Sequence, residues 1–174
     1  MKDIFSIVNK KLILAIRKII TEKDIALKKL QKYCAYQDRC HQEVRSKLLD
    51  LKIYGEDLED IIVSLIEDNY LNEERFACSY ARGRFRMKQW GRVRIKQELK
   101  RRKISAYCLK KAMAEIEEEE YLKTLEHLLK KKNKVLREPN IFKRKAKLAT
   151  FVVGKGYEAS LVWENVHALF DKSK

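Results

Sequence analysis

The sequence repeats itself, and this repetition limits the possible folds more than any other feature of the chain. Residues 25–71 align without a gap with the segment that lies 51 positions further along. Apolar residues meet apolar residues along the alignment. The matched pairs include Val44 with Ile95, Leu48 with Leu99, Ile53 with Ile104, Leu58 with Leu109, Ile62 with Met113, and Leu65 with Ile116.

A third copy follows, with two additional residues near Pro139. Its apolar residues pair with those of the second copy as Ile95 with Leu148, Leu99 with Val152, Ile104 with Tyr157, Leu109 with Val162, Met113 with Val166, and Ile116 with Leu169. A fixed offset that is seen twice is a much stronger signal than the chance agreement of a few apolar residues. The chain is therefore predicted to use one structural unit three times.

Each copy is predicted to be helical, because its apolar residues recur at helical spacing. The expected helices span residues 22–37, 41–52, 56–68, 73–89, 91–103, 105–119, 122–137, 141–154 and 158–171. One proline and five glycines are too few for a turn-rich sandwich or barrel, and they suit helices joined by short turns. We expect an all-α fold of three tandem three-helix repeats that form an elongated, curved array.

The repeat also sets the expected domain boundaries. Residues 21–71, 72–121 and 122–174 form the three predicted repeats, and the second of them is the basic one. Residues 1–20 form an N-terminal extension outside the repeat. Charged residues interrupt its apolar runs before they reach the roughly 18 residues of a membrane span, so we expect no membrane anchor.

The charge of the chain predicts a binding surface. Forty Lys and Arg against 25 Asp and Glu give a net charge of +15. Such a field attracts nucleic acid, acidic protein surfaces or anionic lipid. The excess is concentrated between Arg82 and Lys103, where eleven residues are basic and Glu98 is the one acid. We call residues 82–103 the basic segment.

Two predicted helices carry the basic segment. Arg82 to Arg86 alternate with other residues, and residues two apart on a helix do not share a face, so these charges spread around the first helix. From Arg92 to Lys100 basic residues recur at four-residue steps and form one ridge. The predicted residues for binding a partner or DNA are Arg82, Arg84, Arg86, Lys88, Arg92, Arg94, Lys96, Lys100 and Arg101.

Aromatic and acidic residues near this segment each allow two interpretations. Tyr80, Phe85 and Trp90 interleave with the charges and either pack in the core or stack on nucleic acid bases. The core interpretation is favoured, because aromatic residues at helical spacing are more often buried. The acidic run at residues 115–120 either balances the basic helix beside it or mimics the charge of DNA, and the first interpretation is favoured.

The sequence predicts neither catalysis nor metal binding. Cys34, Cys40, Cys78 and Cys108 form no CxxC pair, and we expect reduced thiols rather than a disulfide framework. Cys34, Cys40 and His41 come nearest to a metal-ligand cluster, but their spacing matches no common zinc site. We see no nucleophile triad and no glycine loop for phosphate, so we expect no cofactor and no enzyme activity.

The run from Asn72 to Ile104 resembles the central signature of the RecX family, the bacterial regulators of RecA recombinase. That signature has an aromatic-Ala pair, an Arg-rich helix, a glycine, and a segment of the form RI-x-x-EL that ends in a basic residue and Ile. The matching residues are Phe76, Ala77, Arg82, Arg84, Gly91, Arg94, Ile95, Glu98, Leu99 and Ile104. The likeness covers about residues 21–171, although the glycine expected in the turn near Lys103-Ile104 is missing.

The resemblance implies a function that the residues alone do not. It implies a regulator that binds the RecA–DNA filament and inhibits the recombinase, ATPase and coprotease activities of RecA in DNA repair, recombination and the SOS response. From the reduced cysteines we expect a cytoplasmic protein, and we expect a monomer. The resemblance also implies RecA and DNA as partners. The alternative is a general DNA-binding helical repeat protein without RecA dependence, whose second helices act as recognition helices.

Overall fold

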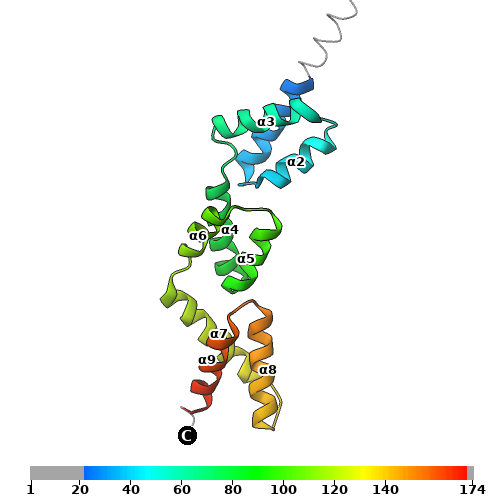
Figure 1. Cartoon of the computed structure of the whole chain (residues 1–174). Coiled ribbons are helices and arrows are strands. Elements are labelled where there is room, and N and C mark those ends of the chain that lie inside the picture. The colour runs from blue at the N-terminus through cyan, green and yellow to red at the C-terminus, as the bar shows by residue number, and fades with distance from the viewer. Residues whose placement is uncertain (1–21, 172–174) are drawn as a thin grey trace, which may run out of the picture. The chain divides into compact units, whose positions relative to one another are not determined.

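The computed structural model describes residues 22–171, and over that range the chain is all-helical and contains no strand (Figure 1). The all-α prediction is therefore confirmed for these residues. The predicted N-terminal extension, residues 1–20, lies outside them. No helix among the described residues has both the length and the apolar character that crossing a membrane requires.

The described chain divides into two compact units, and the division along the sequence falls between Glu73 and Glu74. The first unit holds a helix over residues 22–36, α2 (His41–Asp50) and α3 (Gly55–Glu67). Its core residues recur at three- and four-residue steps, the helical spacing of the apolar residues that matched between the repeats. They are Ala26, Leu30, Cys34, Val44, Leu48, Leu58, Ile61, Ile62, Leu65 and Leu71.

The second unit contains the helices of the second and third predicted repeats. These are α4 (Glu73–Lys88), α5 (Arg92–Arg101), α6 (Ala106–Ala114), α7 (Glu118–Val135), α8 (Ile141–Gly154) and α9 (Ala159–Asp171). The buried face of α4 consists of Phe76, Ala77, Ala81 and Phe85, while α5 buries Ile95 and Leu99. Because the buried residues occupy one stripe on each helix, most basic residues remain on the other faces.

The predicted end of the sixth helix and the predicted start of the seventh are both wrong. The helix expected over residues 105–119 ends at Ala114, and α7 begins at Glu118 rather than at residue 122. Ile116 is buried in the turn between them, so the apolar pattern continued although the helix did not. Three glutamates in the first turn of α7 favour a helix start there, because carboxylates stabilise the positive end of the helix dipole.

The turns after α2, α5 and α8 are equivalent, and each holds a residue with a positive φ. Lys52 has φ 63°, Lys103 has φ 57° and Gly156 has φ 93°. The N–H of Ile104 then donates to the carbonyl of Leu99 at 3.2 Å, which is the closing bond of a Schellman motif. Lys103 thus adopts the left-handed conformation itself, in the turn where the expected glycine is missing.

Candidate polyanion-binding surface on the basic segment

The charges of the basic segment fall into two groups, which differ in what their side chains touch. The inner arginines are half-buried and contact rings, carbonyls or carboxylates of the second unit. They are Arg84, Arg92, Arg94 and Arg102. The outer face is exposed. It consists of Arg86, Lys88, Lys96 and Lys100.

The rings of Tyr80 and Trp90 contact three of the four inner arginines, Arg84, Arg94 and Arg102. The guanidinium carbon of Arg84 lies 4.9 Å from the ring centroid of Tyr80 and 5.2 Å from that of Trp90. Arg94 covers the same Trp90 ring at 4.0 Å. These are cation–π contacts, so Tyr80 and Trp90 already have planar cations over their faces. Phe85 is buried, which confirms the core interpretation for this residue.

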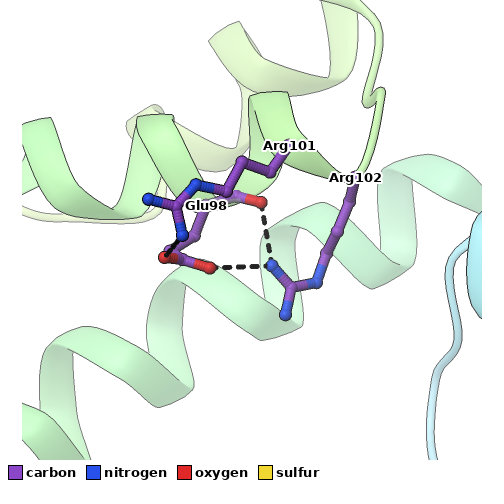
Figure 2. Close-up of polar contacts among 3 residues, drawn as sticks. All are labelled: Glu98, Arg101 and Arg102. Carbon is purple, nitrogen blue, oxygen red and sulfur yellow. Dashed lines mark hydrogen bonds and ion pairs between the residues drawn. The ribbon is translucent and has the colours of Figure 1, made fainter.

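Glu98 accepts hydrogen bonds from two arginines whose side chains differ in exposure (Figure 2). Arg102 donates to the carbonyl oxygen of Glu98 at 2.9 Å and to its Oε2 at 3.0 Å. Arg101 donates to Oε1 at 2.9 Å, but 74% of its side chain is exposed against 25% for Arg102. Arg102 also lies 5.0 Å from the Tyr80 ring, so it ties α5 to α4, whereas Arg101 forms a surface pair.

Arg92 is largely enclosed, with 19% of its side chain exposed. It pairs with Glu118 at 2.7 Å and donates to the carbonyl oxygen of Ile116 at 2.9 Å. Its guanidinium carbon also lies 4.2 Å from the ring centroid of Tyr121. Arg92 therefore fixes the turn between α6 and α7 and is not available to a partner in this conformation.

Tyr121 connects α5 to the third repeat. Its hydroxyl accepts from the backbone N–H of Arg92 at 3.1 Å and donates to Oε2 of Glu158 at 2.6 Å. Its ring stacks on Tyr157 with centroids 4.7 Å apart. Burial, followed by the bond to Glu158, raises the pKa of Tyr121 well above its ordinary range, so the phenol stays neutral and keeps donating.

The backbone completes this connection at Gly91 and Gly156, a contact that we call the glycine joint. The N–H of Gly91 donates to the carbonyl of Lys155 at 2.9 Å, and that of Val93 to the carbonyl of Gly156 at 3.0 Å. The first N–H groups of a helix lack partners within it, and here the turn after α8 supplies them. A Cβ on Gly91 would lie 2.1 Å from the Gly156 oxygen, so no larger residue fits.

The outer face has no such contacts. Within residues 22–171, the side chains of Arg86, Lys88, Lys96 and Lys100 are exposed and have no carboxylate partner. Lys96 and Lys100 lie one turn apart on α5, so they share a face. This face can therefore meet an anionic partner without first breaking an ion pair.

Arg82 is intermediate, because it pairs with Glu115 at 3.1 Å while both side chains stay partly exposed. Exposed pairs contribute only about 0–1 kcal/mol, so a stronger anion displaces the carboxylate at small cost. Glu115 and Glu118 both belong to the acidic run, and they pair with Arg82 and Arg92. At these two positions the acidic run balances the basic segment, as predicted.

The structure separates residues that the sequence grouped together. Arg92 was placed on a ridge with Lys96 and Lys100, but its partners Ile116, Glu118 and Tyr121 turn it inward. Sequence reasoning missed Arg102 as a structural residue. The signal was Glu98 four positions earlier, which is the spacing of a helical ion pair.

Residues 22–171 contain no group of three His, Cys, Asp or Glu side chains that is placed to hold a metal ion. Cys34, Cys40 and Cys108 are buried, and burial raises the pKa of the half-buried Cys78. A raised pKa disfavours the thiolate, which is the reactive form of cysteine.

Comparison with known proteins identifies the family. The model of "RecX, second three-helix domain" matches residues 72–113, and that of "RecX, third three-helix domain" matches residues 118–164. "Regulatory protein RecX" of Shigella dysenteriae serotype 1 (strain Sd197) is 30% identical over 144 residues, which cover 75% of this chain and 85% of that protein. The chain belongs to the RecX family.

Other RecX proteins support this assignment. "Regulatory protein RecX" of Salmonella paratyphi A is 31% identical over 144 residues and is covered to 85%. That of Bacillus cereus (strain B4264) is 25% identical over 130 residues, and the chain spans 48% of its length. The RecX relatives are named as regulatory proteins.

Solved structures of RecX proteins share the fold. "Crystal structure of RecX from Lactobacillus salivarius" gives a TM-score of 0.76 at 21% identity and covers 86% of this chain and 97% of that one. "Crystal structure of regulatory protein RecX" gives a TM-score of 0.78 at 21% identity, with coverage of 89% and 77%. The predicted helical repeat fold is thus confirmed as a RecX fold.

Proposed function

We propose that the protein binds the RecA–DNA filament as a cytoplasmic monomer and inhibits the recombinase, ATPase and coprotease activities of RecA. Family membership supports a regulatory role. The observation that carries the proposed contact is the outer face of the basic segment, with its exposed cations and no carboxylate partners in residues 22–171. Its partner is the acidic surface of RecA, the bound DNA, or both.

Two classes of basic residue contribute differently in this proposal. The outer-face cations contact the filament directly, and the exposed pairs of Arg82 and Arg101 exchange their carboxylates for it. The inner arginines act indirectly, because they hold α4, α5 and α7 in the arrangement that presents the outer face. Of the nine residues predicted from the sequence, we therefore propose that Arg84, Arg92 and Arg94 support the surface.

The direct test is the DNA-stimulated ATPase of RecA with increasing amounts of this protein. We expect inhibition, and an unchanged rate at several-fold excess would contradict the proposal. An outer-face variant carries Arg86→Glu, Lys96→Glu and Lys100→Glu. It should need about tenfold more protein for the same inhibition, because like charges then oppose the contact.

A matched control makes this test specific. Lys28, Lys29 and Lys32 are exposed lysines of the first unit, and Lys28→Glu, Lys29→Glu and Lys32→Glu change the net charge by the same amount. Inhibition should be nearly unchanged in this control. Circular dichroism checks that both variants remain helical, and equal losses in the two would assign the effect to net charge alone.

The alternative is DNA binding without RecA, in which second helices act as recognition helices. Recognition helices present their N-terminal residues to base edges. At the start of α5 the backbone N–H groups of Gly91 and Val93 are instead bonded to the turn after α8, and the Arg92 side chain is held by Glu118 and Ile116. Co-sedimentation separates the two functions: equally tight binding to naked DNA with and without RecA would favour the alternative.

A further inference from the structure

A second basic stretch lies outside the basic segment. Between Lys130 and Lys147 nine residues are Lys or Arg, and Glu138 is the one acid. This stretch covers the end of α7, the loop after it and the first half of α8, which Figure 1 draws in yellow to orange. We call residues 130–147 the α7–α8 hairpin.

Some of its charges hold the hairpin together. Arg144 donates from Nε to Oδ1 of Asn133 at 2.7 Å and from a terminal nitrogen to the Asn133 carbonyl at 2.8 Å. Lys147 pairs with Glu138 across the loop, and that ion pair lowers the pKa of the Glu138 carboxyl. These contacts fix α8 against the end of α7.

Four further cations of the hairpin are exposed. Within residues 22–171 their side chains have no carboxylate partner. They are Lys131, Lys134, Arg137 and Lys143. Lys131 and Lys134 lie three residues apart on α7 and so are neighbours on its surface. The hairpin thus presents exposed cations that a polyanion can meet directly.

The start of α8 conflicts with the usual preference of helix termini. Asn140 caps the helix by accepting from the N–H groups of Phe142 and Lys143, each at 3.0 Å. The first turn nevertheless contains no acidic residue and does contain Lys143, whose charge opposes the helix dipole. The Asn140 cap stabilises this helix start, and Lys143 remains exposed there.

Apolar side chains accompany these charges. Phe142 is 80% exposed and Val135 is 69% exposed, and each adjoins an exposed lysine in the sequence. The hairpin also has an open groove of about 410 Å³ between α7 and α8. Apolar atoms of Leu136, Ala146 and Phe151 line the groove together with Thr150, Lys132 and Lys147. Proteins that bind single-stranded nucleic acid combine cations, which contact the phosphates, with exposed aromatic rings, which stack on the bases.

We propose that the α7–α8 hairpin binds single-stranded nucleic acid, with phosphates on its exposed cations and a base against Phe142. A duplex hides the faces of its bases, so the exposed ring favours a single strand over a duplex. The surface differs from the outer face on α4 and α5. It therefore goes beyond the proposed RecA contact and does not depend on it.

The test uses the full chain and fluorescence anisotropy with a labelled oligothymidylate of about 20 nucleotides, without RecA. The hairpin variant carries Lys131→Gln, Lys134→Gln and Lys143→Gln, and the control carries Lys28→Gln, Lys29→Gln and Lys32→Gln. We expect about tenfold weaker binding for the hairpin variant at moderate salt. Its log–log salt slope should also fall by about two, because each single-strand phosphate contact contributes about 0.7.

Further arms identify the ligand class. Phe142→Ala should weaken binding to the single strand about fivefold and leave binding to a duplex of the same sequence unchanged. Equal loss of affinity in the hairpin and control variants would overturn the proposal, as would no binding of the oligothymidylate by the parent protein. Competition by poly-L-glutamate as effective as that by the oligonucleotide, at equal charge, would assign the surface to an acidic polypeptide instead.

Discussion

The inner arginines of the basic segment contact rings, carbonyls and carboxylates, whereas the outer face of the same two helices contacts solvent. All four inner residues are arginines, and three of the four outer residues are lysines. A guanidinium is planar and weakly hydrated, so it packs on Tyr80, Trp90 or Tyr121 at modest cost. An ammonium is strongly hydrated and stays in water.

This difference shows that a count of charges does not measure a binding surface. Eleven basic residues lie between Arg82 and Lys103, yet Arg84, Arg92, Arg94 and Arg102 are engaged within the second unit. Changes at inner positions should therefore lower stability, and changes at outer positions should lower binding. Each prediction below tests that division, and both tryptophans lie in the second unit, so their fluorescence reports on its unfolding.

The largest effect on stability is expected at the glycine joint, where the start of α5 bonds to the turn after α8. Gly91→Ala places a Cβ about where the Gly156 carbonyl lies and should lower the free energy of unfolding by roughly 3 kcal/mol or more. Urea titration followed by tryptophan fluorescence measures this. Gly83→Ala on α4 is the control, since nothing lies near its Cβ position, and should raise stability by about 0.5–1 kcal/mol.

A smaller loss is expected when one inner arginine is removed. Arg92→Ala deletes the contacts to Glu118, Ile116 and Tyr121 and should cost about 2 kcal/mol. Lys96→Ala, one turn away on the outer face, should stay within about 0.5 kcal/mol of the parent. The same urea titration compares them, and equal effects would remove the distinction between inner and outer residues.

The stacked pair of Tyr121 and Tyr157 predicts that the stability of the fold depends on pH. Burial raises the pKa of Tyr121 and of Tyr157 in the folded state, so their neutral forms stabilise the fold below their unfolded pKa of about 10. Above that pH, stability should fall by roughly 1 kcal/mol per pH unit for each tyrosine.

Tyr121→Phe isolates one of the two contributions. It should lower stability at neutral pH by about 1–2 kcal/mol, because the N–H of Arg92 and the carboxylate of Glu158 lose a partner. It should also make the decline between pH 10 and 11 shallower. Tryptophan fluorescence in urea at a series of pH values measures both effects, and an unchanged slope would contradict the assignment.

The smallest effect is expected at the turn that ends α5. Lys103 has φ 57°, a conformation that costs a non-glycine residue about 1 kcal/mol. Lys103→Gly should therefore stabilise the second unit by about 0.5–1 kcal/mol. Lys96→Gly inside the same helix should destabilise it by about 1 kcal/mol, which provides a control of the same residue type.

Sequence reasoning recovered what local periodicity encodes. The spacing of residues such as Val44, Ile95 and Leu148 predicted the repeat and the helices, and all three are buried. The end of α6 was missed because Ile116 keeps the apolar spacing inside a turn. A pattern of this kind reports burial and does not distinguish a buried turn residue from a helical one.

The division of the basic segment was not accessible from the sequence. Arg92 turns inward because of partners that lie 24 and 29 residues later in the chain, and no local pattern marks them. Gly91 was identified as part of a family signature. The structure shows why a glycine is needed there: the backbone of Gly156, in another repeat, leaves no room for a Cβ. Such long-range contacts depend on how the repeats pack.

Co-sedimentation with RecA filaments over a salt series tests the central claim most directly. The samples are the parent protein, the variant with Arg86→Glu, Lys96→Glu and Lys100→Glu, and the control with Lys28→Glu, Lys29→Glu and Lys32→Glu. The account predicts that the outer-face variant leaves the pellet at a salt concentration where parent and control remain, while its urea unfolding is unchanged. An outer-face variant that sediments like the control at every salt concentration would contradict it.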